Sequence, residues 1–214
     1  MKLFFDLDGT LMDPGVGITR CLQYALAGLG RPIPPAEGLK RFVGPPLRDT
    51  FAELLESQEQ GQLEQAIALY RARFVPTGMF ENEVYPGIPE GLERLRRAGH
   101  RLWVVTSKPH VYAQKILGHF NLDGWFEAVY GSELSGVNAD KADLIRHVLR
   151  IEGIGAEEPW MVGDRVHDVE AARKTGIAAI GVLWGYGTEE ELSNARPHHL
   201  VRSMAELCDL VAAR

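Results

Sequence analysis

From Tyr85 onward, short apolar segments alternate regularly with helical patterns, and this alternation constrains the fold more than any other feature. Strands are expected at 101–106, 128–130, 160–163 and 177–182, and helices at 89–98, 111–120, 141–152 and 168–175. Two capping boxes, Thr188 with Glu191 and Ser203 with Glu206, predict two more helices. Strands that alternate with helices build a mostly parallel sheet covered on both faces. The sequence therefore predicts a Rossmann-like α/β core.

The region before Tyr85 begins with one more apolar strand, which stops at Asp8-Gly9. Three helical stripes follow it, at 18–29, 47–55 and 63–74, and no strand signal separates them. We therefore expect an α/β catalytic core at 1–14 and 84–214, with a helical cap domain at 15–83 inserted after the first strand. The two linkers are expected to act as a hinge pair, because a lid on two linkers can close over a site and expel water.

Composition narrows the possible functions of the 214-residue chain. With 45% hydrophobic residues it can form a sizeable core, and a net charge of −6 gives no basic excess of the kind that nucleic-acid binders show. Cys21 and Cys208 have no metal-like spacing, so buried thiols are expected. The sequence has no signal-peptide pattern and no apolar run long enough to cross a membrane, which favours a cytoplasmic location.

Polar residues follow the predicted core strands at the point where each strand ends. Because the carboxyl ends of parallel strands meet at one edge of a sheet, these segments are expected to lie together. Their polar residues are Asp6, Asp8, Gly9 and Thr10, then Thr106, Ser107 and Lys108, then Gly163, Asp164 and Asp168, with Lys141 at the start of a helix.

Asp6 and Asp8 face the same side of an extended strand, since residues two apart share a face. Their carboxylates repel each other by about 4 kcal/mol at a separation of about 4 Å and an effective dielectric constant near 20. Asp164 and Asp168 add further negative charge. A hard divalent cation relieves this repulsion, and Mg²⁺ is the usual partner of carboxylates together with phosphate. No His-Cys cluster indicates zinc.

Lys141 and Thr106 supply the opposite polarity, because an ammonium and a hydroxyl group can both bind phosphoryl oxygens. Each also has a plainer interpretation, as a surface lysine in a helix's first turn and as a turn residue. Arg48, in the helical insert, is a candidate contact for a substrate's leaving group, and a surface role is the alternative.

These segments resemble the motifs of the haloacid dehalogenase superfamily of phosphatases, in the same order. Residues 4–11, Phe-Phe-Asp-Leu-Asp-Gly-Thr-Leu, look like the first motif, and 104–106, Val-Val-Thr, look like the second. Lys141 stands where the third-motif lysine would be, and 163–168, Gly-Asp-Arg-Val-His-Asp, resemble the fourth. The resemblance covers the whole chain, and a helical cap after the first motif is also a family feature.

The resemblance implies specific roles. Asp6 would attack phosphorus and form an aspartyl-phosphate, while Asp8 would act as the acid and base. Mg²⁺ would be held by the Asp6 carboxylate, the Asp8 backbone carbonyl and Asp164, with Asp168 completing or orienting this shell. The residues implied to bind phosphate or substrate are Gly9, Thr10, Thr106, Ser107 and Lys141, with Arg48 as the cap candidate.

Within the superfamily the chain looks most like the phosphoglycolate phosphatase group and nearby 5′-nucleotidase-like members. The features that carry this likeness are Thr-Ser-Lys-Pro at 106–109, Gly-Pro-Pro-Leu at 44–47 and Gly-Tyr-Gly at 185–187. Arg165 and Ala142 depart from the common pattern, which has Ser and Pro there, and this leaves the phosphate ester open. A small phosphorylated metabolite is the expected partner, in a monomer or homodimer.

Several other functions compete with a phosphoglycolate-like phosphatase. A 5′-nucleotidase acting on nucleoside monophosphates and a phosphosugar mutase both share Asp6 and Asp8. Haloalkanoate dehalogenation is disfavoured, because a halide leaves without a proton and needs no second aspartate. A non-enzymatic phospho-receiver module is about half as long, carries its phosphorylated aspartate on a middle strand, and has no helical insert.

Overall fold

The structure is a computed structural model that describes residues 1–155 and 159–213. The chain divides into two compact units, one formed by Met1–Met12 with Val84–Arg214 and the other by Asp13–Glu83. The chain passes between them at β2 (Met12–Asp13) and β3 (Glu83–Val84), and these two short strands form a two-stranded sheet.

The first unit is built on a six-stranded sheet whose order is β5-β4-β1-β6-β7-β8. Each pair of neighbouring strands runs parallel. The strands are β1 (Lys2–Phe5), β4 (Arg101–Pro109), β5 (Ala128–Ser132), β6 (Pro159–Gly163), β7 (Ala178–Val182) and β8 (His199–Val201). The predicted mostly parallel α/β fold is therefore confirmed.

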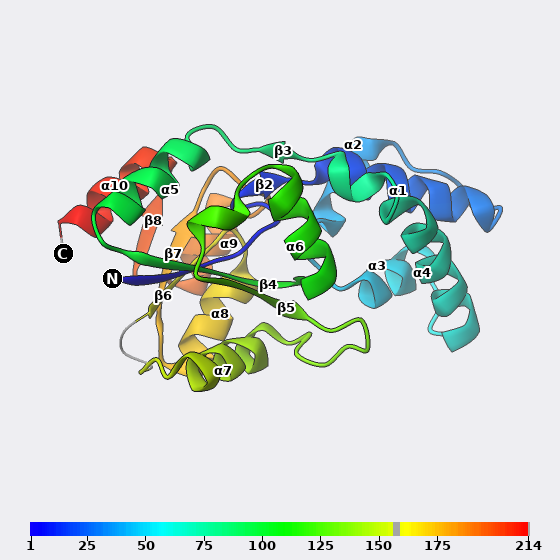
Figure 1. Cartoon of the computed structure of the whole chain (residues 1–214). Helices are drawn as coiled ribbons and strands as arrows, with labels where there is room; N and C mark the ends of the chain where they lie inside the picture. Colours follow the sequence, from blue (N-terminus) through cyan, green and yellow to red (C-terminus); the bar gives the residue numbers. More distant parts are fainter. Residues whose placement is uncertain (156–158, 214) are drawn as a thin grey trace. The chain divides into compact units, whose positions relative to one another are not determined.

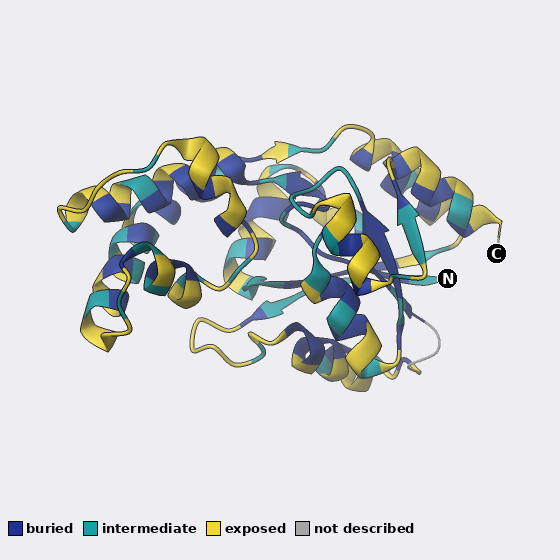
Figure 2. Ribbon diagram, turned by 180° about the vertical axis from the view of Figure 1, so that it is seen from behind, coloured by how far each residue is buried: buried dark blue, intermediate teal, exposed yellow. Residues whose placement is uncertain are grey.

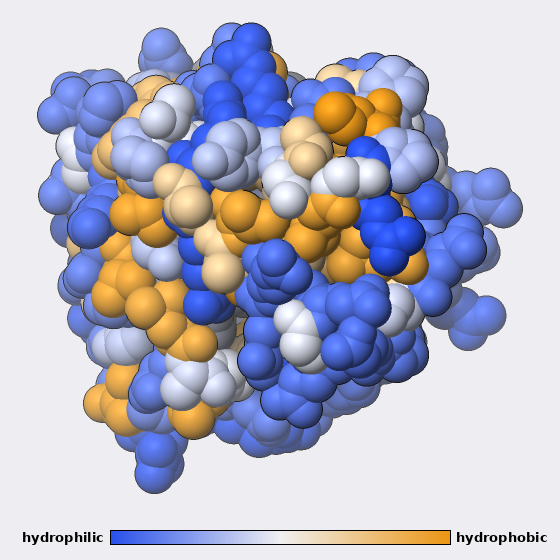
Figure 3. Space-filling model, turned by 90° about the vertical axis from the view of Figure 1, so that its right-hand side faces the viewer, coloured by the Kyte–Doolittle hydropathy of each residue, from blue (hydrophilic) through white to orange (hydrophobic). Residues whose placement is uncertain are grey.

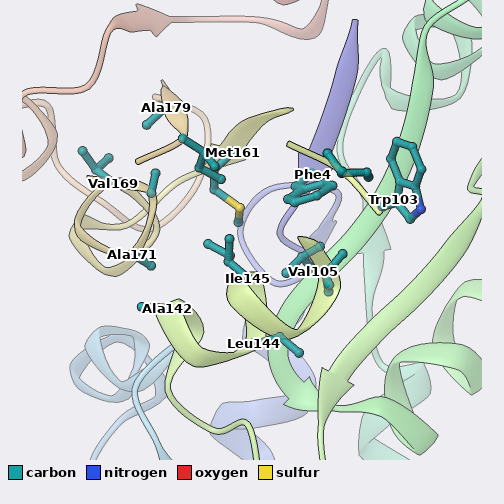
Figure 4. Packing of buried hydrophobic residues seen from close by; sticks show 14 of the residues in the cluster. Phe4, Trp103, Val105, Ala142, Leu144, Ile145, Met161, Val169, Ala171 and Ala179 are labelled. Carbon is teal, nitrogen blue, oxygen red and sulfur yellow. The ribbon is translucent and has the colours of Figure 1, made fainter. Parts of the chain in front are cut away.

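Alternate residues of the central strands pack on opposite faces of this sheet, as the two-residue period of a strand requires. The register places Phe4 of β1 beside Trp103 of β4 and Met161 of β6. All three are fully buried, and the rings of Phe4 and Trp103 meet edge to face with centroids 5.8 Å apart. Figure 4 shows this layer with Ile145 and Val169 from the covering helices packed into it.

Helices cover both faces of the sheet (Figure 1). On one face lie α7 (Lys141–Glu152) and α8 (Val166–Thr175), and on the other lie α5 (Ile88–Arg97), α6 (His110–His119) and α10 (Met204–Ala212). The strands are largely buried, while the helices bury one side and expose the other (Figure 2). The remaining elements of this unit are α9 (Glu189–Ala195) and the short helix η3 (Asp123–Trp125).

The strand order places a topological switch point at β1. The chain adds β4 and β5 on one side of β1 and then crosses to add β6, β7 and β8 on the other. In open α/β sheets, ligands bind beyond the carboxyl ends of the strands at such a point. The residues after β1, β4 and β6 are thereby placed where a ligand site is expected.

The second unit is helical. It contains α1 (Gly15–Gly28), α2 (Ala36–Leu39), η1 (Lys40–Phe42), α3 (Leu47–Leu54), α4 (Gln60–Phe74) and η2 (Gly78–Phe80). An aromatic row links α3 to α4, because Phe51 meets Tyr70 edge to face and Tyr70 stacks on Phe74. The three long helices match the three stripes in the sequence, and α2 is an additional short helix.

Several details differ from the predicted elements. β4 runs three residues past Thr106, with a register shift between Thr106 and Pro109 where it pairs with β5. Such an irregularity lets a strand end bend and re-aim its side chains. Strand β8 was not predicted, and β7 begins at Ala178 rather than Ile177. Cys21 and Cys208 are buried thiols, as expected.

The surface carries few large exposed apolar side chains. Those more than two-fifths exposed are Val16, Tyr24, Ile33, Val111, Leu134, Val137 and Ile151. Figure 3 shows a face on which hydrophobic atoms are interspersed with hydrophilic ones. Among the described residues, every helix is too short or too polar to cross a bilayer.

Candidate active site

Asp6 and Asp8 follow β1 and are held at the middle of the sheet. The Asp6 amide donates to the Val162 carbonyl at 2.9 Å, which extends the β1–β6 pairing by one residue. Asp6 Oδ1 and Asp8 Oδ1 are both buried without a hydrogen-bond partner. Two buried carboxylate oxygens without partners are costly unless a cation or substrate satisfies them.

Lys141 joins three segments that are far apart in sequence. Its ammonium lies 2.9 Å from Asp6 Oδ2 and also contacts Asp168 Oδ1, and it is almost fully buried. Asp140 positions it by capping α7, since Asp140 Oδ1 accepts from the amides of Ala142 and Asp143 at 2.8 and 3.1 Å. Burial alone would lower the pKa of Lys141, but the Asp168 and Asp6 carboxylates outweigh burial and raise it. Lys141 therefore remains a cation.

Asp164 follows β6 and is fixed on both carboxylate oxygens. Oδ1 accepts from the Thr10 hydroxyl at 3.2 Å and Oδ2 from the Tyr186 amide at 2.8 Å. Gly9 and Gly187 allow this close approach. A Cβ on Gly9 would lie 2.1 Å from Asp164 Oδ2, and one on Gly187 would lie 1.9 Å from the Asp164 carbonyl oxygen.

Burial and the repulsion between neighbouring carboxylates raise the pKa of two acidic residues in this cluster. Burial raises the pKa of Asp164 to about 7, with the Asp168 and Asp6 charges adding to it and the Tyr186 amide opposing it. Burial also raises the pKa of Asp168, against the pull of Lys141. One ammonium thus faces the carboxylates of Asp6, Asp164 and Asp168.

These three carboxylates fit a metal ion. Each of Asp6, Asp164 and Asp168 offers an oxygen, and these oxygens lie within 4.8 Å of one another. The donors are all oxygen, which hard cations such as Mg²⁺ prefer. Asp6 Oδ1 is buried without a hydrogen-bond partner, as expected of an oxygen that a cation would bind. The carboxylate of Asp8 is not part of this close set.

Thr106 is the last residue of β4 that pairs in regular register with β5, and Ser107 follows it where the register shifts. The Thr106 side chain is buried, and its hydroxyl oxygen accepts from the Lys108 amide at 3.3 Å. Because that oxygen already accepts, its own O–H can donate elsewhere, as to a phosphoryl oxygen. The Ser107 carbonyl accepts from the Ser132 hydroxyl at 2.8 Å, which ties this turn to β5.

Lys108 was expected at this edge of the sheet without a role, and the structure gives it a partner there. Its ammonium forms a buried ion pair with Asp8 Oδ2, across one hundred positions of the chain. The sequence shows only that Lys108 comes two residues after Thr106. In a regular strand, these two side chains would point to the same face of the sheet. The irregular end of β4 is what makes this pairing unreadable from the sequence.

Thr10 and Arg48, two other predicted site residues, belong to different units of the chain. Thr10, expected at the phosphate, is fully buried and gives its hydroxyl hydrogen to Asp164. Arg48 is half exposed within the helical unit, where its guanidinium lies 3.9 Å from Glu64. The nearby Trp184 indole donates to the Thr10 carbonyl at 2.9 Å, so it braces the loop after β1.

The chain is similar to known proteins over most of its length. A family model described as haloacid dehalogenase-like hydrolase matches residues 3–182. A 5′-nucleotidase of Pseudomonas aeruginosa is 48% identical over 206 residues, which is 96% of this chain and 93% of that protein. A phosphoglycolate phosphatase of Aquifex aeolicus is 29% identical, over 94% and 95% of the two chains. The crystal structure of a predicted phosphatase from Clostridium acetobutylicum superposes with a TM-score of 0.94 at 39% identity, covering 100% of this chain and 98% of that one.

Proposed function

We propose that this chain, which belongs to the haloacid dehalogenase-like hydrolases and is a phosphoric monoester hydrolase, cleaves a small phosphomonoester through an aspartyl-phosphate on Asp6 with Mg²⁺ as its metal. The observation that carries this proposal is the convergence of Asp6, Lys141, Asp164 and Asp168 at the carboxyl ends of β1 and β6.

Asp6 is the proposed nucleophile because it combines a fixed oxygen with one that has no partner. Lys141 anchors Oδ2, and Oδ1 is buried without a hydrogen bond. An Asp6 oxygen attacks phosphorus, the bond from phosphorus to the ester oxygen breaks, and that oxygen leaves as an alkoxide. Water then attacks the phosphorus of the aspartyl-phosphate, which releases phosphate and restores Asp6.

Asp8 is the proposed acid and base. In the first step it gives a proton to the leaving alkoxide, and in the second it takes one from the attacking water. Its second oxygen is held by Lys108, which fixes the direction of the carboxyl group. The same pair places a positive charge beside the site where a phosphoryl group would arrive.

Thr106 and Lys141 are the proposed holders of the phosphoryl oxygens. The Thr106 O–H is able to donate, and the Lys141 ammonium is a buried positive charge beside the nucleophile. Donors that are already in place stabilise the charge of a transferring phosphoryl group without reorganisation. Ser107 and Gly9 flank these groups as candidates for further backbone contacts.

Asp6, Asp164 and the Asp8 backbone carbonyl would hold Mg²⁺, with Asp168 beside them holding Lys141. When bound, the metal ion neutralises charge on the carboxylates and on the phosphoryl oxygens. Thr10, Gly9 and Gly187 shape this position through Asp164.

Two substrate classes follow from the relatives. The 48% identity to a 5′-nucleotidase favours a nucleoside 5′-monophosphate, and the 29% identity to a phosphoglycolate phosphatase keeps a phosphoglycolate-like ester as the competing candidate. Both carry a single phosphate ester, so the same proposed chemistry serves either.

The test is phosphate release with and without Mg²⁺ from nucleoside monophosphates, phosphoglycolate and sugar phosphates. We expect Mg²⁺-dependent release, and a loss of kcat by about 10⁴-fold or more in Asp6→Asn, with an unchanged circular dichroism spectrum. Asp209→Asn, at an exposed aspartate of α10, is the matched control and should keep full activity. Comparable turnover by Asp6→Asn would refute the nucleophile, and isomerised sugar phosphate without phosphate release would indicate a mutase.

A further inference from the structure

Asp6 and Asp8 are held in the same way, by two lysines from different segments of the chain. Lys141 contacts Asp6 Oδ2 and Lys108 contacts Asp8 Oδ2. Among the described residues, Oδ1 of each aspartate is buried without a hydrogen-bond partner. Each aspartate therefore has one oxygen anchored by an ammonium group and one oxygen in a position to react or to bind a ligand.

The backbone around Asp8 is fixed by a tight loop, so the direction of its carboxyl group depends on the side chain. Asp8 forms a bridge with Met12, and the Gly9 amide donates to the Met12 carbonyl at 2.8 Å. The side-chain torsions of Asp8 could still turn the carboxyl group between staggered positions. The ion pair with Lys108 opposes this rotation. Only 7% of the Lys108 side chain and 13% of the Asp8 side chain are exposed, so water weakens the pair little.

The irregular end of β4 presents Lys108 to Asp8, and β5 holds that strand end in place. The Lys108 amide donates to the Thr106 hydroxyl oxygen at 3.3 Å, and β5 contributes a second contact through the Ser132 hydroxyl. A Cβ on Gly131 of β5 would lie 2.3 Å from the Lys108 carbonyl oxygen. Gly131 therefore lets β5 approach the strand end more closely than a larger residue could. The sheet itself fixes where the Lys108 side chain begins.

We propose that Lys108 is a positioning residue that directs the proton of Asp8 at the leaving group, and that it thereby determines how well the site cleaves alkyl esters. The inference rests on the proposed function and deepens it. Because Oδ2 faces the Lys108 ammonium, Oδ1 is the atom that carries the proton. The O–H bond on Oδ1 breaks while an O–H bond forms on the departing ester oxygen, and Asp8 is left as a carboxylate paired with Lys108.

Leaving groups differ in how much they need this proton. An alkoxide is a strong base and leaves poorly unless it is protonated, whereas p-nitrophenolate is a weak base that leaves without a proton. A positioned acid contributes about 10²–10⁴-fold to a rate, and a misplacement of about 1 Å can cost about 10²-fold. Loss of Lys108 should therefore slow the cleavage of alkyl esters more than that of aryl esters. A lysine that bound the phosphoryl group instead would serve both kinds of ester equally.

The test compares kcat/KM for AMP and phosphoglycolate, which are alkyl esters, with kcat/KM for p-nitrophenyl phosphate, an aryl ester. This constant covers the steps up to departure of the leaving group, so it separates the acid role of Asp8 from the later attack of water. In Lys108→Met, the ratio of the alkyl to the aryl values should fall at least about tenfold. Lys115→Met removes the same charge from the exposed side of α6 and should keep the wild-type ratio.

A double variant tests whether Lys108 acts through Asp8. Asp8→Asn/Lys108→Met removes both charges of the pair, so it folds even where Lys108→Met alone is destabilised by a buried carboxylate without its partner. If Lys108 acts only by directing Asp8, adding Lys108→Met to Asp8→Asn should change the residual kcat/KM for the alkyl esters by no more than about threefold.

Two results would overturn the inference. One is an alkyl-to-aryl ratio in Lys108→Met equal to that of the wild type, which is the result that a lysine bound to the phosphoryl group would give. The other is a loss greater than about threefold when Lys108→Met is added to Asp8→Asn. Absence of phosphate release from all three esters with the wild type would instead refute the proposed function.

Discussion

Thr10 holds, through its hydroxyl group, one of the three carboxylates proposed to bind the metal ion. Its Oγ1 donates to Asp164 Oδ1, and the side chain is fully buried. Thr10→Val keeps the shape and removes the donor, so we expect Asp164 to lose its orientation and the Mg²⁺ concentration for half-maximal activity to rise about 10- to 100-fold. The measurement is phosphate release against Mg²⁺ concentration.

The chain offers a matched control for this substitution. Thr50, in the helical unit, is equally buried, and its hydroxyl has no hydrogen-bond partner among the residues that the structure describes. Thr50→Val should leave the Mg²⁺ dependence unchanged. An identical response in the two variants would mean that the Thr10 hydroxyl does not act through Asp164.

Gly9 is required at its position for two separable reasons. Its φ of +81° strains any other residue, and a Cβ would lie 2.1 Å from Asp164 Oδ2. Gly99 has a φ of +84° but no atom within 4 Å of a built Cβ, so Gly99→Ala measures the strain alone. We expect Gly9→Ala to lower the free energy of unfolding by about 1–3 kcal/mol more than Gly99→Ala does.

Activity should separate the same two glycine variants. Gly9→Ala must displace the Asp164 carboxylate, so it should lose most Mg²⁺-dependent turnover, while Gly99→Ala should keep it. Urea unfolding and phosphate release on both proteins provide the comparison. Equal activity in the two would show that Asp164 can move away without consequence.

At the scale of elements, the cap of α7 connects helix stability to the site. Asp140 Oδ1 accepts from two amides of the first turn, and Lys141 is the first helical residue. Asp140→Ala should cost about 1 kcal/mol of stability and also reduce kcat, because the Lys141 ammonium loses its fixed place. Thermal unfolding and kcat, measured on the same preparation, check both parts.

Ser203 is the control for that prediction. It caps α10 by accepting from the Glu206 amide at 3.2 Å, away from the acidic cluster. Ser203→Ala should cost a similar amount of stability and leave kcat unchanged. A fall in kcat of the same size in both variants would show that the effect of Asp140 is general destabilisation.

The elements themselves were largely readable from the sequence, and their side-chain partners were not. The limits of α7 and its cap, Asp140, follow from local pattern and match the structure. Glu191 was expected to close a capping box with Thr188. Instead its carboxylate accepts from Arg165 Nε and the Val166 amide, both at 2.9 Å, while the Thr188 hydroxyl still caps α9. Contacts between distant segments produce no periodic pattern in the sequence. The strand β8 has only three residues, which is too short to produce one.

At the scale of the whole molecule, the order of strands was readable only in part. Alternating strands and helices predict a parallel sheet, but β1 lies between β4 and β6 only because the chain crosses over after β5. That crossover is what gathers Asp6, Lys141 and Asp164 from three segments. The ordered motifs indicated that these residues act together, while the Lys108–Asp8 pair depended on the irregular end of β4.

The gathered carboxylates make the stability of the metal-free molecule depend on pH. The pKa of Asp164 is about 7 in the fold, above the ordinary value of 3.8, so between these values the folded state holds a proton that the unfolded state releases. Stability contributed by this group therefore falls as pH rises from about 4 to about 7, and the full cost of the buried charge remains above that. In EDTA, the free energy of unfolding should drop across this window.

Comparison with Asp164→Asn isolates the contribution of this one carboxyl group. Asparagine cannot ionise, so the variant should lose less stability than the wild type between pH 5 and pH 8, as measured by urea unfolding in EDTA. Mg²⁺ binds the ionised form, so it should stabilise the wild type more at pH 8 than at pH 5, and should stabilise Asp164→Asn less at either pH. The contradicting outcome is that the wild type and Asp164→Asn show the same stability in EDTA at every pH. Asp164 would then ionise without cost to the fold. The electrostatic argument for a metal ion at this site would lose its main support.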